Sequence, residues 1–190
     1  MTMNMQSLNL SKFIVSTFFL LFGLMVTKPT SLETLADIPV QVVKAVDPKQ
    51  LSCLAKNIYH EAGSESVKGQ AAVAWVVMNR VRHGFGSTPC SVVFQASNIQ
   101  HETESGKIEK IKMCQFSWVC EGKADPNKQS EKYKQAEQVA YDVMVHKAYN
   151  NILPSTALFF HNLAVNPMWP YRQVAKIGNH VFYSNAKKSN

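Results

Sequence analysis

The feature that most restricts the fold of this chain is the segment Val67 to Val81, which carries apolar residues on nearly every face of a helix. A helix that is apolar all round is stable only when neighbouring elements cover it, so it is expected at the centre of a domain. Ser66 is suited to cap its first turn, and Gly84 is where it is expected to end. The sequence therefore predicts a domain built around one buried helix.

Other helices and a few short strands are expected around this segment. Asp47 followed by Pro48 is typical of a helix start, and apolar residues at helical spacing continue to Gly63. The remaining expected elements are a helical turn at 89–94, a helix from Ser130 to about Tyr149, a strand at 157–160 and a hairpin at 172–183. The polar stretch Asn98 to Lys112 is expected to be a mobile surface excursion. The predicted fold class is mostly α with a small β element.

The composition removes several classes of protein. With 46% hydrophobic and 10% aromatic residues, the chain has the material for a core, which intrinsically disordered chains lack. The formal net charge of +7 implies an acidic partner. Nucleic acid, anionic lipid and acidic polysaccharide would all be attracted to such a surface, so the charge does not choose among them.

The N-terminal segment indicates export. Lys12 precedes the 14-residue apolar run Phe13 to Val26, which suits a secretory signal better than a full membrane span of about 20 residues. No clean small-x-small site follows Val26, so an uncleaved anchor through residues 13–26 stays open, as does a buried helix. We expect a signal or anchor at 1–27, a linker at 28–46 and the domain at 47–190, located in the periplasm, in the cell wall or outside the cell.

If the chain is exported, it meets an oxidising environment in which its four cysteines can form two disulfides. Four cysteines can be paired in three ways. Cys114 and Cys120 close a short local loop, so this pairing is favoured, with Cys53–Cys90 as the second bond. A zinc site would require cysteines two to four residues apart, and no two cysteines have that spacing. No metal is expected.

Glu61 is the residue that the sequence marks most clearly for chemistry. On a helix it shares a face with Leu54 and Ile58, and it lies where that helix is about to end. Apolar surroundings and the negative helix C-terminus both disfavour its anion, which raises the pKa of the carboxyl group. A raised pKa suits a general acid near neutral pH. The alternative is a structural role, in which Glu61 caps the helix or pairs with Arg80 or Lys68.

Other motifs are less informative singly. His60 and Glu61 do not form H-E-x-x-H, so the metalloprotease interpretation fails. Trp118 and Trp169 could stack on sugar rings or be buried in the core. No glycine-rich phosphate loop, G-x-S-x-G elbow or dinucleotide fingerprint is present.

Several separated segments together resemble the SleB-type cell-wall hydrolases, the family of the spore cortex-lytic enzymes. The resemblance runs from about Leu51 to Tyr183. The matching segments are Leu54–Glu65, Gly69–Ala74, Asn79–Val81, Cys90–Gln95, Gln115–Trp118 and Ile177–Tyr183. The family commonly has Glu-Ala-Arg-Gly-Glu where this chain has Glu61-Ala-Gly-Ser-Glu65, which leaves any role of that arginine in doubt but keeps Glu61 in register.

The resemblance implies a fold like the lytic transglycosylases and lysozymes and a peptidoglycan substrate, with Glu61 as the catalytic glutamate. In such enzymes one glutamate protonates the glycosidic oxygen and then activates the muramyl 6-hydroxyl, which explains the lack of an evident carboxylate pair. The candidate substrate-binding residues are Tyr59, Gln115, Ser117, Trp118, His161 and Asn179. We expect a monomer without a cofactor, which binds peptidoglycan glycan strands and touches the membrane only through its N-terminal segment.

Three alternatives remain at this point. A hydrolytic muramidase or glucosaminidase would use Glu65 or Glu121 as a second carboxylate, although Glu65 is also suited to a structural cap. A non-catalytic module that binds the cell wall would use the basic charge and the aromatic residues. Nucleic-acid binding fits the charge but neither the signal segment nor the lack of a basic stripe.

Overall fold

The computed structural model describes residues 45–187. The expected signal or anchor and most of the expected linker lie outside these residues. The helices are α1 (Pro48–Ala62), α2 (Val67–Arg82), α3 (Pro89–Val93), α4 (Ser117–Cys120) and α5 (Glu131–Tyr141), and α5 continues into the π-helical segment η1 (Asp142–His146). The strands are β1 (Ala96–Glu102), β2 (Ile108–Cys114), β3 (Ala157–Asn162), β4 (Tyr171–Ile177) and β5 (His180–Lys187).

The fold is mixed rather than mostly α. Helices account for about 39% and strands for about 24% of the described residues. The prediction of a small β element therefore underestimates the share of strands. The difference comes mainly from β1 and β2, because their exposed and polar strands lack the apolar alternation by which a half-buried strand is recognised. None of the helices in residues 45–187 is both long and apolar enough to cross a membrane.

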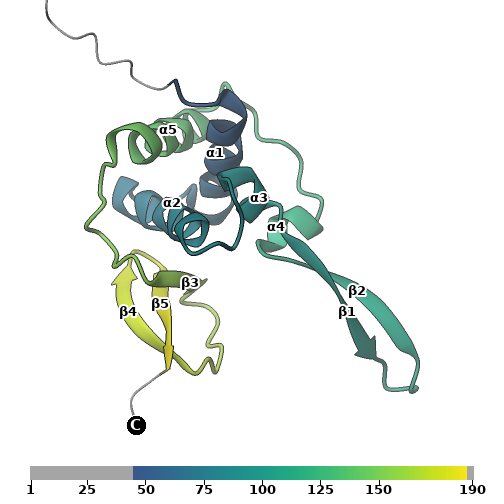
Figure 1. Ribbon diagram of the computed structural model, residues 1–190. Coiled ribbons are helices and arrows are strands. Elements are labelled where there is room, and N and C mark those ends of the chain that lie inside the picture. The colour runs from purple at the N-terminus through teal and green to yellow at the C-terminus, as the bar shows by residue number, and fades with distance from the viewer. Residues whose placement is uncertain (1–44, 188–190) are drawn as a thin grey trace, which may run out of the picture. The chain divides into compact units, whose positions relative to one another are not determined.

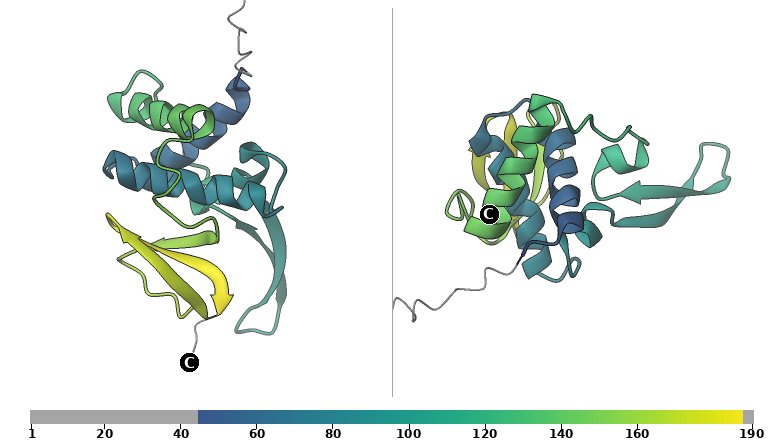
Figure 2. Two further views of the ribbon diagram at one scale, coloured as in Figure 1. Left: turned by 60° about the vertical axis from the view of Figure 1, so that its left-hand side comes forward. Right: turned by 90° about the horizontal axis from the view of Figure 1, so that it is seen from above.

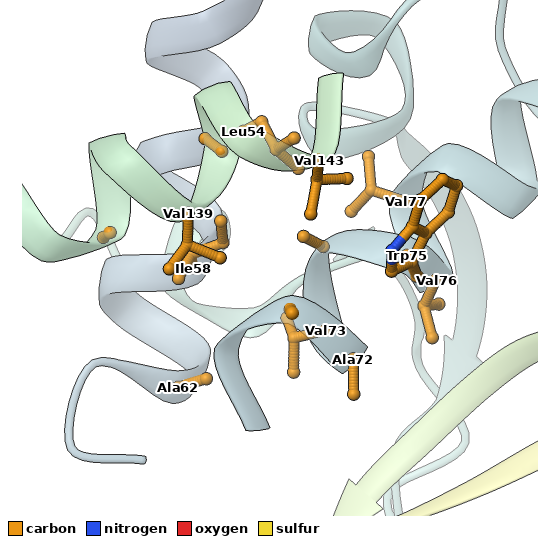
Figure 3. Packing of buried hydrophobic residues seen from close by; sticks show 14 of the residues in the cluster. Leu54, Ile58, Ala62, Ala72, Val73, Trp75, Val76, Val77, Val139 and Val143 are labelled. Atoms are coloured by element: carbon orange, nitrogen blue, oxygen red, sulfur yellow. The ribbon is translucent and has the colours of Figure 1, made fainter. Parts of the chain in front are cut away.

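Helix α2 lies at the centre of the helical part, as the sequence predicts. Val73, Val76 and Val77 are completely buried, and they lie among apolar side chains from α1, α5 and η1 (Figure 3). Leu54 and Ile58 supply the α1 side of this core. Burying one such side chain contributes roughly 1.5–3 kcal/mol. The core therefore fixes α1 against α2 and, with them, the end of α1 where Glu61 lies.

The predicted helix starts are confirmed by their caps. The Asp47 carboxylate accepts a hydrogen bond from the Lys49 amide (2.8 Å), and the Ser130 hydroxyl accepts one from the Tyr133 amide (3.2 Å). Ser66 caps α2 in the same way. The third helix ends earlier than predicted, because its last turn widens into η1 and the chain then reverses through Lys147 at φ 54°.

A three-stranded antiparallel sheet of order β3-β5-β4 lies below α2 in Figure 1. It contains the predicted hairpin, in which β4 and β5 are joined by a tight turn at Gly178 and Asn179. Gly178 has φ +56°, the left-handed region in which a side chain is strained. The sheet places this turn beside the start of α2.

Strands β1 and β2 form a separate antiparallel hairpin that projects from the helices (Figures 1 and 2). Its register runs from the pair Ala96 and Cys114 to the pair Glu102 and Ile108. All its residues except Cys114 are exposed. The expected surface location is confirmed, but the segment is a regular hairpin rather than an irregular excursion.

Both predicted disulfides are present. Cys53–Cys90 joins α1 to α3, with an S–S distance of 2.06 Å. Cys114–Cys120 joins the end of β2 to α4, with an S–S distance of 2.08 Å. The second bond closes the short segment that runs from the hairpin into the cleft described below.

Candidate active site

A cleft of about 670 Å³ lies between the helical part and the β3-β5-β4 sheet. The end of α1, the turn between α1 and α2, and Arg80 near the end of α2 supply one side of it, and the residues within the Cys114–Cys120 loop supply another. Strand β3, the β3–β4 loop and the β4–β5 turn complete it. The cleft therefore collects side chains from segments that are far apart in the sequence.

Glu61 lines this cleft from the last turn of α1 and is half-buried. Burial raises the pKa of its carboxyl group to about 7, and the nearby Glu121 acts in the same direction. Lys123 and Arg80 oppose this rise. The direction agrees with the one expected from the sequence, and burial is its main cause.

The alternative structural role of Glu61 finds no support in its contacts. None of the ion pairs within residues 45–187 includes Glu61, so it is not paired with Arg80 or Lys68. None of the side-chain hydrogen bonds of the described part uses its carboxylate as a helix cap either. The carboxyl group is therefore free to contact a ligand in the cleft.

Arg80 is a buried cation beneath the cleft, 3% exposed on α2. Its Nε donates to the Leu158 carbonyl oxygen (2.7 Å), and its guanidinium lies 5.3 and 5.7 Å from the ring centres of Phe116 and Phe159. Gln115 turns its amide oxygen to Arg80 Nη1 and Nη2, at 2.9 and 3.2 Å. Burial lowers the pKa of Arg80 to about 10, against the effect of Glu61. The guanidinium is therefore held in one orientation and still charged at neutral pH.

The Glu65 carboxylate contacts the β4–β5 turn. Its side chain is 9% exposed, and its Oε1 accepts a hydrogen bond from the Asn179 amide (3.1 Å). The same oxygen lies 3.6 Å from His180 Nδ1. Burial lowers the pKa of His180, with Glu65 opposing this and His161 adding to it. Glu65 thus fixes the turn to the start of α2, a structural role different from the helix cap that Ser66 supplies.

The Cys114–Cys120 loop brings three predicted site residues to the cleft: Gln115, Ser117 and Trp118. Trp118 is only 5% exposed. Its indole N–H donates to Asn57 Oδ1 (3.1 Å), and its ring stacks on His60 with centres 4.4 Å apart. Trp118 is therefore a packed wall of the cleft rather than a free platform for a sugar ring.

Aromatic side chains from β3 and from the β3–β4 loop form another wall. Phe159, Phe160, His161 and Trp169 all line the cleft. The His161 ring is held by a hydrogen bond between its Nε2 and the Tyr183 hydroxyl (2.9 Å). Trp169 is half-buried and meets His161 edge-on, with ring centres 5.6 Å apart. Of the two tryptophans considered from the sequence, Trp169 is the one with an accessible face.

Five of the six predicted substrate-binding residues lie around the cleft with Glu61, namely Gln115, Ser117, Trp118, His161 and Asn179. Tyr59 does not line it. Tyr59 packs beside Tyr133, and Lys132 Nζ lies 4.6 Å from its ring centre. Tyr59 precedes Glu61 by two positions on the helix, which corresponds to about 200° of rotation around the helix axis. The two side chains therefore point in nearly opposite directions.

The sequence did not single out several cleft residues. Lys123 follows the disulfide loop without any recognisable motif, and Phe159 and Phe160 were predicted only as a strand. Arg80 was considered only as a cation of the last helical turn and as a salt-bridge partner, although its position in a largely apolar helix was a usable signal. A cation inside such a helix must find polar partners from elsewhere in the fold.

The arrangement combines a half-buried acid, a fixed buried cation and an aromatic wall. Such a set can transfer a proton to an oxygen of a polar, uncharged ligand that stacks on aromatic rings. Among the described residues, no group of three or more histidine, cysteine or acidic side chains is placed to hold a metal ion.

Comparisons with known proteins give two matches. The sequence model of a family described as Cell Wall Hydrolase matches residues 64–183. The crystal structure of the catalytic domain of the Bacillus cereus SleB protein matches with a TM-score of 0.50 and 22% sequence identity, over 74% of this chain and 94% of that one. No curated protein sequence matches. Glu61 lies three residues before the family match begins, so its role depends on the geometry of the cleft.

Proposed function

Because this chain belongs to the cell wall hydrolase family, we propose that it cleaves the glycosidic bond between N-acetylmuramic acid and N-acetylglucosamine, with Glu61 as the catalytic acid. Membership of the family makes the chain a peptidoglycan-degrading enzyme. The bond that is cut, the acid and the form of the product are the proposal.

The observation that carries the proposal is the pKa of Glu61, raised to about 7 in the cleft. An unperturbed glutamate is almost fully ionised at neutral pH and cannot donate a proton. With a pKa near 7, about half of the molecules carry the proton at neutral pH, and the resulting carboxylate is still basic enough to take a proton back. One group can therefore serve as acid and then as base.

Within residues 45–187, the lack of a second uncommitted carboxylate in the cleft favours a lytic transglycosylase. Retaining and inverting glycosidases use two carboxyl groups, about 5–5.5 Å or about 6.5–9.5 Å apart. The second acid that lines the cleft, Glu65, is engaged by Asn179 and faces His180. Glu121 is exposed, and hydrogen bonds from Lys123 and Ser117 lower the pKa of its carboxyl group. Neither residue is placed as well as Glu61 to act on a ligand in the cleft.

In the proposed reaction Glu61 gives its proton to the glycosidic oxygen as the bond from that oxygen to C1 of the muramyl sugar breaks. The leaving sugar departs with a free hydroxyl group. Glu61, now a carboxylate, removes the proton of the muramyl 6-hydroxyl, whose oxygen forms a new bond to C1. The products are a 1,6-anhydro sugar and a shortened strand, Glu61 is protonated again, and no water is consumed.

Arg80 and Lys123 assist this cycle by stabilising the carboxylate form of Glu61, since both lower its pKa. Gln115 holds the Arg80 guanidinium from the cleft side. We propose that His161 and Asn179 contact the sugar by hydrogen bonds, and that Trp169 stacks on a sugar ring. Tyr59 is left out of this site because it faces away from the cleft.

The proposal is tested by the chemical end that the reaction leaves. Purified sacculi are digested by the protein in water enriched in ¹⁸O, and the soluble fragments are analysed by mass spectrometry. A lytic transglycosylase leaves 1,6-anhydro ends without ¹⁸O. Reducing ends that carry ¹⁸O would instead identify a hydrolase that activates water.

We also propose that the enzyme acts outside the cytoplasm as a monomer. The two disulfides support the location, since such bonds persist in oxidising compartments. Intact mass of the protein isolated from cells would show whether residues 1–27 are removed and whether all four cysteines are oxidised. Sedimentation of the same sample tests the monomer.

A further inference from the structure

A second hollow lies at the base of the β1–β2 hairpin and adjoins the cleft. Its volume is about 380 Å³, within the range of about 300–1,000 Å³ common for small-molecule sites. Residues from both strands line it, together with Phe85 and Gln115. Gln115 also lines the cleft that contains Glu61, so the two hollows lie on either side of one residue or next to each other around it.

The lining of this groove is uncharged. Gln95, Ser97 and Gln115 offer amide and hydroxyl groups, and Phe85 and Met113 offer apolar surface. Ser97 and Met113 are directly opposite each other in the hairpin, so their side chains lie on the same face. Met113 is 52% exposed, so its side chain is accessible to a ligand in the groove.

The groove is built into a braced part of the fold. The Gln115 amide donates to the Gln95 carbonyl oxygen (2.8 Å), which continues the pairing of the strands one step beyond the register of β1 and β2. The disulfide Cys114–Cys120 ties the same end of the hairpin to α4. A ligand therefore meets a preformed surface, which reduces the ordering cost of binding.

We propose that this groove binds an N-acetylated sugar unit of the same glycan strand that occupies the cleft, beyond the bond that is cut. The inference rests on the proposed function and adds a binding site to it. A polymer that fills the cleft must leave it, and the groove shares the lining residue Gln115 with the cleft.

The chemistry of the groove selects the sugar rather than the stem peptide of peptidoglycan. Stem peptides carry carboxylates, which would be expected to meet lysine or arginine side chains. None of the residues that line the groove is charged. Amide and hydroxyl groups next to apolar side chains suit the hydroxyl and acetamido groups of a neutral amino sugar and the apolar face of its ring.

A groove away from the reacting bond adds binding energy equally to the ground state and the transition state. It therefore lowers KM without changing kcat, and only for strands long enough to reach it. The enzyme is expected to have a higher kcat/KM on long glycan strands than on short fragments that fill the cleft alone.

The test compares peptide-free glycan fragments of defined length, from tetrasaccharides to strands of more than ten sugars, cleaved by the full-length protein. Met113→Ala removes apolar contact, and Ser97→Trp fills the groove. Each change is expected to raise KM on long strands about threefold to tenfold, with kcat unchanged and with no change on the short fragments.

Matched controls come from the next positions on the same face of the hairpin. Ile111→Ala and Ile99→Trp alter exposed residues that do not line the groove, and they should leave both substrates unaffected. Equal kcat/KM of the wild type on long and short glycans, or equal losses on both in the groove variants, would overturn the proposal. If the wild type cleaves no glycan of any length, the proposed function fails instead.

Discussion

At the scale of single residues, the proposed chemistry of the cleft depends on the ionisation of Glu61. The residues around Glu61 set the pKa of its carboxyl group. Burial disfavours the carboxylate, Glu121 adds to that effect, and Lys123 and Arg80 oppose it. The outcome is a group that changes its charge near pH 7. Because the free-enzyme pKa of an essential acid appears in kcat/KM, this balance can be read directly from activity.

Activity should fall as the pH rises through about 7, since Glu61 then loses the proton that it donates in the proposed reaction. Lys123→Gln removes a cation that lowers the pKa of Glu61, so the alkaline limb should move to higher pH by a fraction of a unit. Glu121→Gln removes an anion that raises this pKa, so the limb should move to lower pH. Profiles of kcat/KM at low salt measure both shifts.

Shifts of the same sign in the two variants would contradict this electrostatic account. High salt provides the control, because it screens the exposed Lys123 and Glu121 and should bring both profiles back toward that of the wild type. A loss of all activity in Glu121→Gln would instead support a hydrolase in which Glu121 is the second carboxylate.

The same raised pKa has a cost in stability. Between pH 4.5 and about 7 the folded chain holds the Glu61 proton more tightly than the unfolded chain does, so the free energy of unfolding falls as the pH rises. In Glu61→Gln the side chain does not titrate, so this fall in the free energy of unfolding is absent. The variant should be more stable than the wild type by about 1–3 kcal/mol at pH 8 and similar to it at pH 4.

Urea unfolding at the two pH values measures this difference. Glu104→Gln, in the exposed loop of the β1–β2 hairpin, is the control and should unfold like the wild type at both. A Glu61→Gln variant that is less stable at pH 8 than the wild type would show that the carboxylate has a stabilising partner.

The raised pKa of Glu61 could be predicted from the sequence because its signals are local: apolar residues at helical spacing and the end of the helix. Arg80 and Lys123 could not be assigned to the site in the same way. Their roles depend on β3 and on the Cys114–Cys120 loop, which reach them only through tertiary folding. Tyr59 was included because it lies within the Glu61 motif, but its direction on the helix removes it.

At the scale of structural elements, the two disulfides should affect different properties of the protein. Cys53–Cys90 spans 37 residues and Cys114–Cys120 only 6. In the chain-entropy model these loops stabilise the fold by about 4 and about 2 kcal/mol. The short bond, however, closes the segment that carries Gln115, Ser117 and Trp118 into the cleft.

Replacing Cys114 and Cys120 by serine should therefore lower kcat/KM about tenfold or more with a modest loss of stability. The same replacement at Cys53 and Cys90 should lower the stability more, while the molecules that remain folded keep most of their activity. Unfolding curves and turnover at a temperature where both variants are folded separate the two effects. The reverse pattern would contradict the role given to the short loop.

The β4–β5 turn is a second element that positions the site. Gly178 has φ +56°, and a Cβ there would collide with the Glu65 carboxylate. Gly178→Ala should destabilise the fold by about 1–3 kcal/mol, through backbone strain and through this collision. Gly106→Ala, at φ +76° but with its nearest neighbour Glu102 Oε1 at 4.0 Å, should cost less because only the strain applies.

A double-mutant cycle separates the two contributions. In a Glu65→Ala background the collision is gone, so Gly178→Ala should cost about as much as Gly106→Ala. An unchanged cost would show that Glu65 does not define the space at the turn.

The sequence predicted elements best where local chemistry or burial patterns decide them. The caps at Asp47 and Ser130 and the tight turn at Gly178 are such cases. The β1–β2 hairpin was missed as a strand pair because both of its faces are exposed, which leaves no alternation of apolar and polar residues to detect. The end of α5 was missed because η1 continues the apolar spacing.

At the scale of the whole molecule, the largely apolar helix α2 is the element around which the other helices pack. It could be placed at the centre from sequence because apolar residues occupy nearly every face of it. The cleft could not be constructed in this way, since it lies where α1, the disulfide loop and the sheet come together around that helix. The net charge of +7 is consistent with an acidic wall polymer but identifies no substrate on its own.

The most direct test of the central claim compares the wild type with Glu61→Gln on purified peptidoglycan sacculi at pH 6, with soluble muropeptides measured by mass spectrometry. Circular dichroism confirms that both proteins are folded. If Glu61 is the catalytic acid, the wild type should release muropeptides, and Glu61→Gln should do so at a rate about 10²–10⁴-fold lower, as expected for loss of a general acid. Equal release by the two proteins would contradict this role of Glu61.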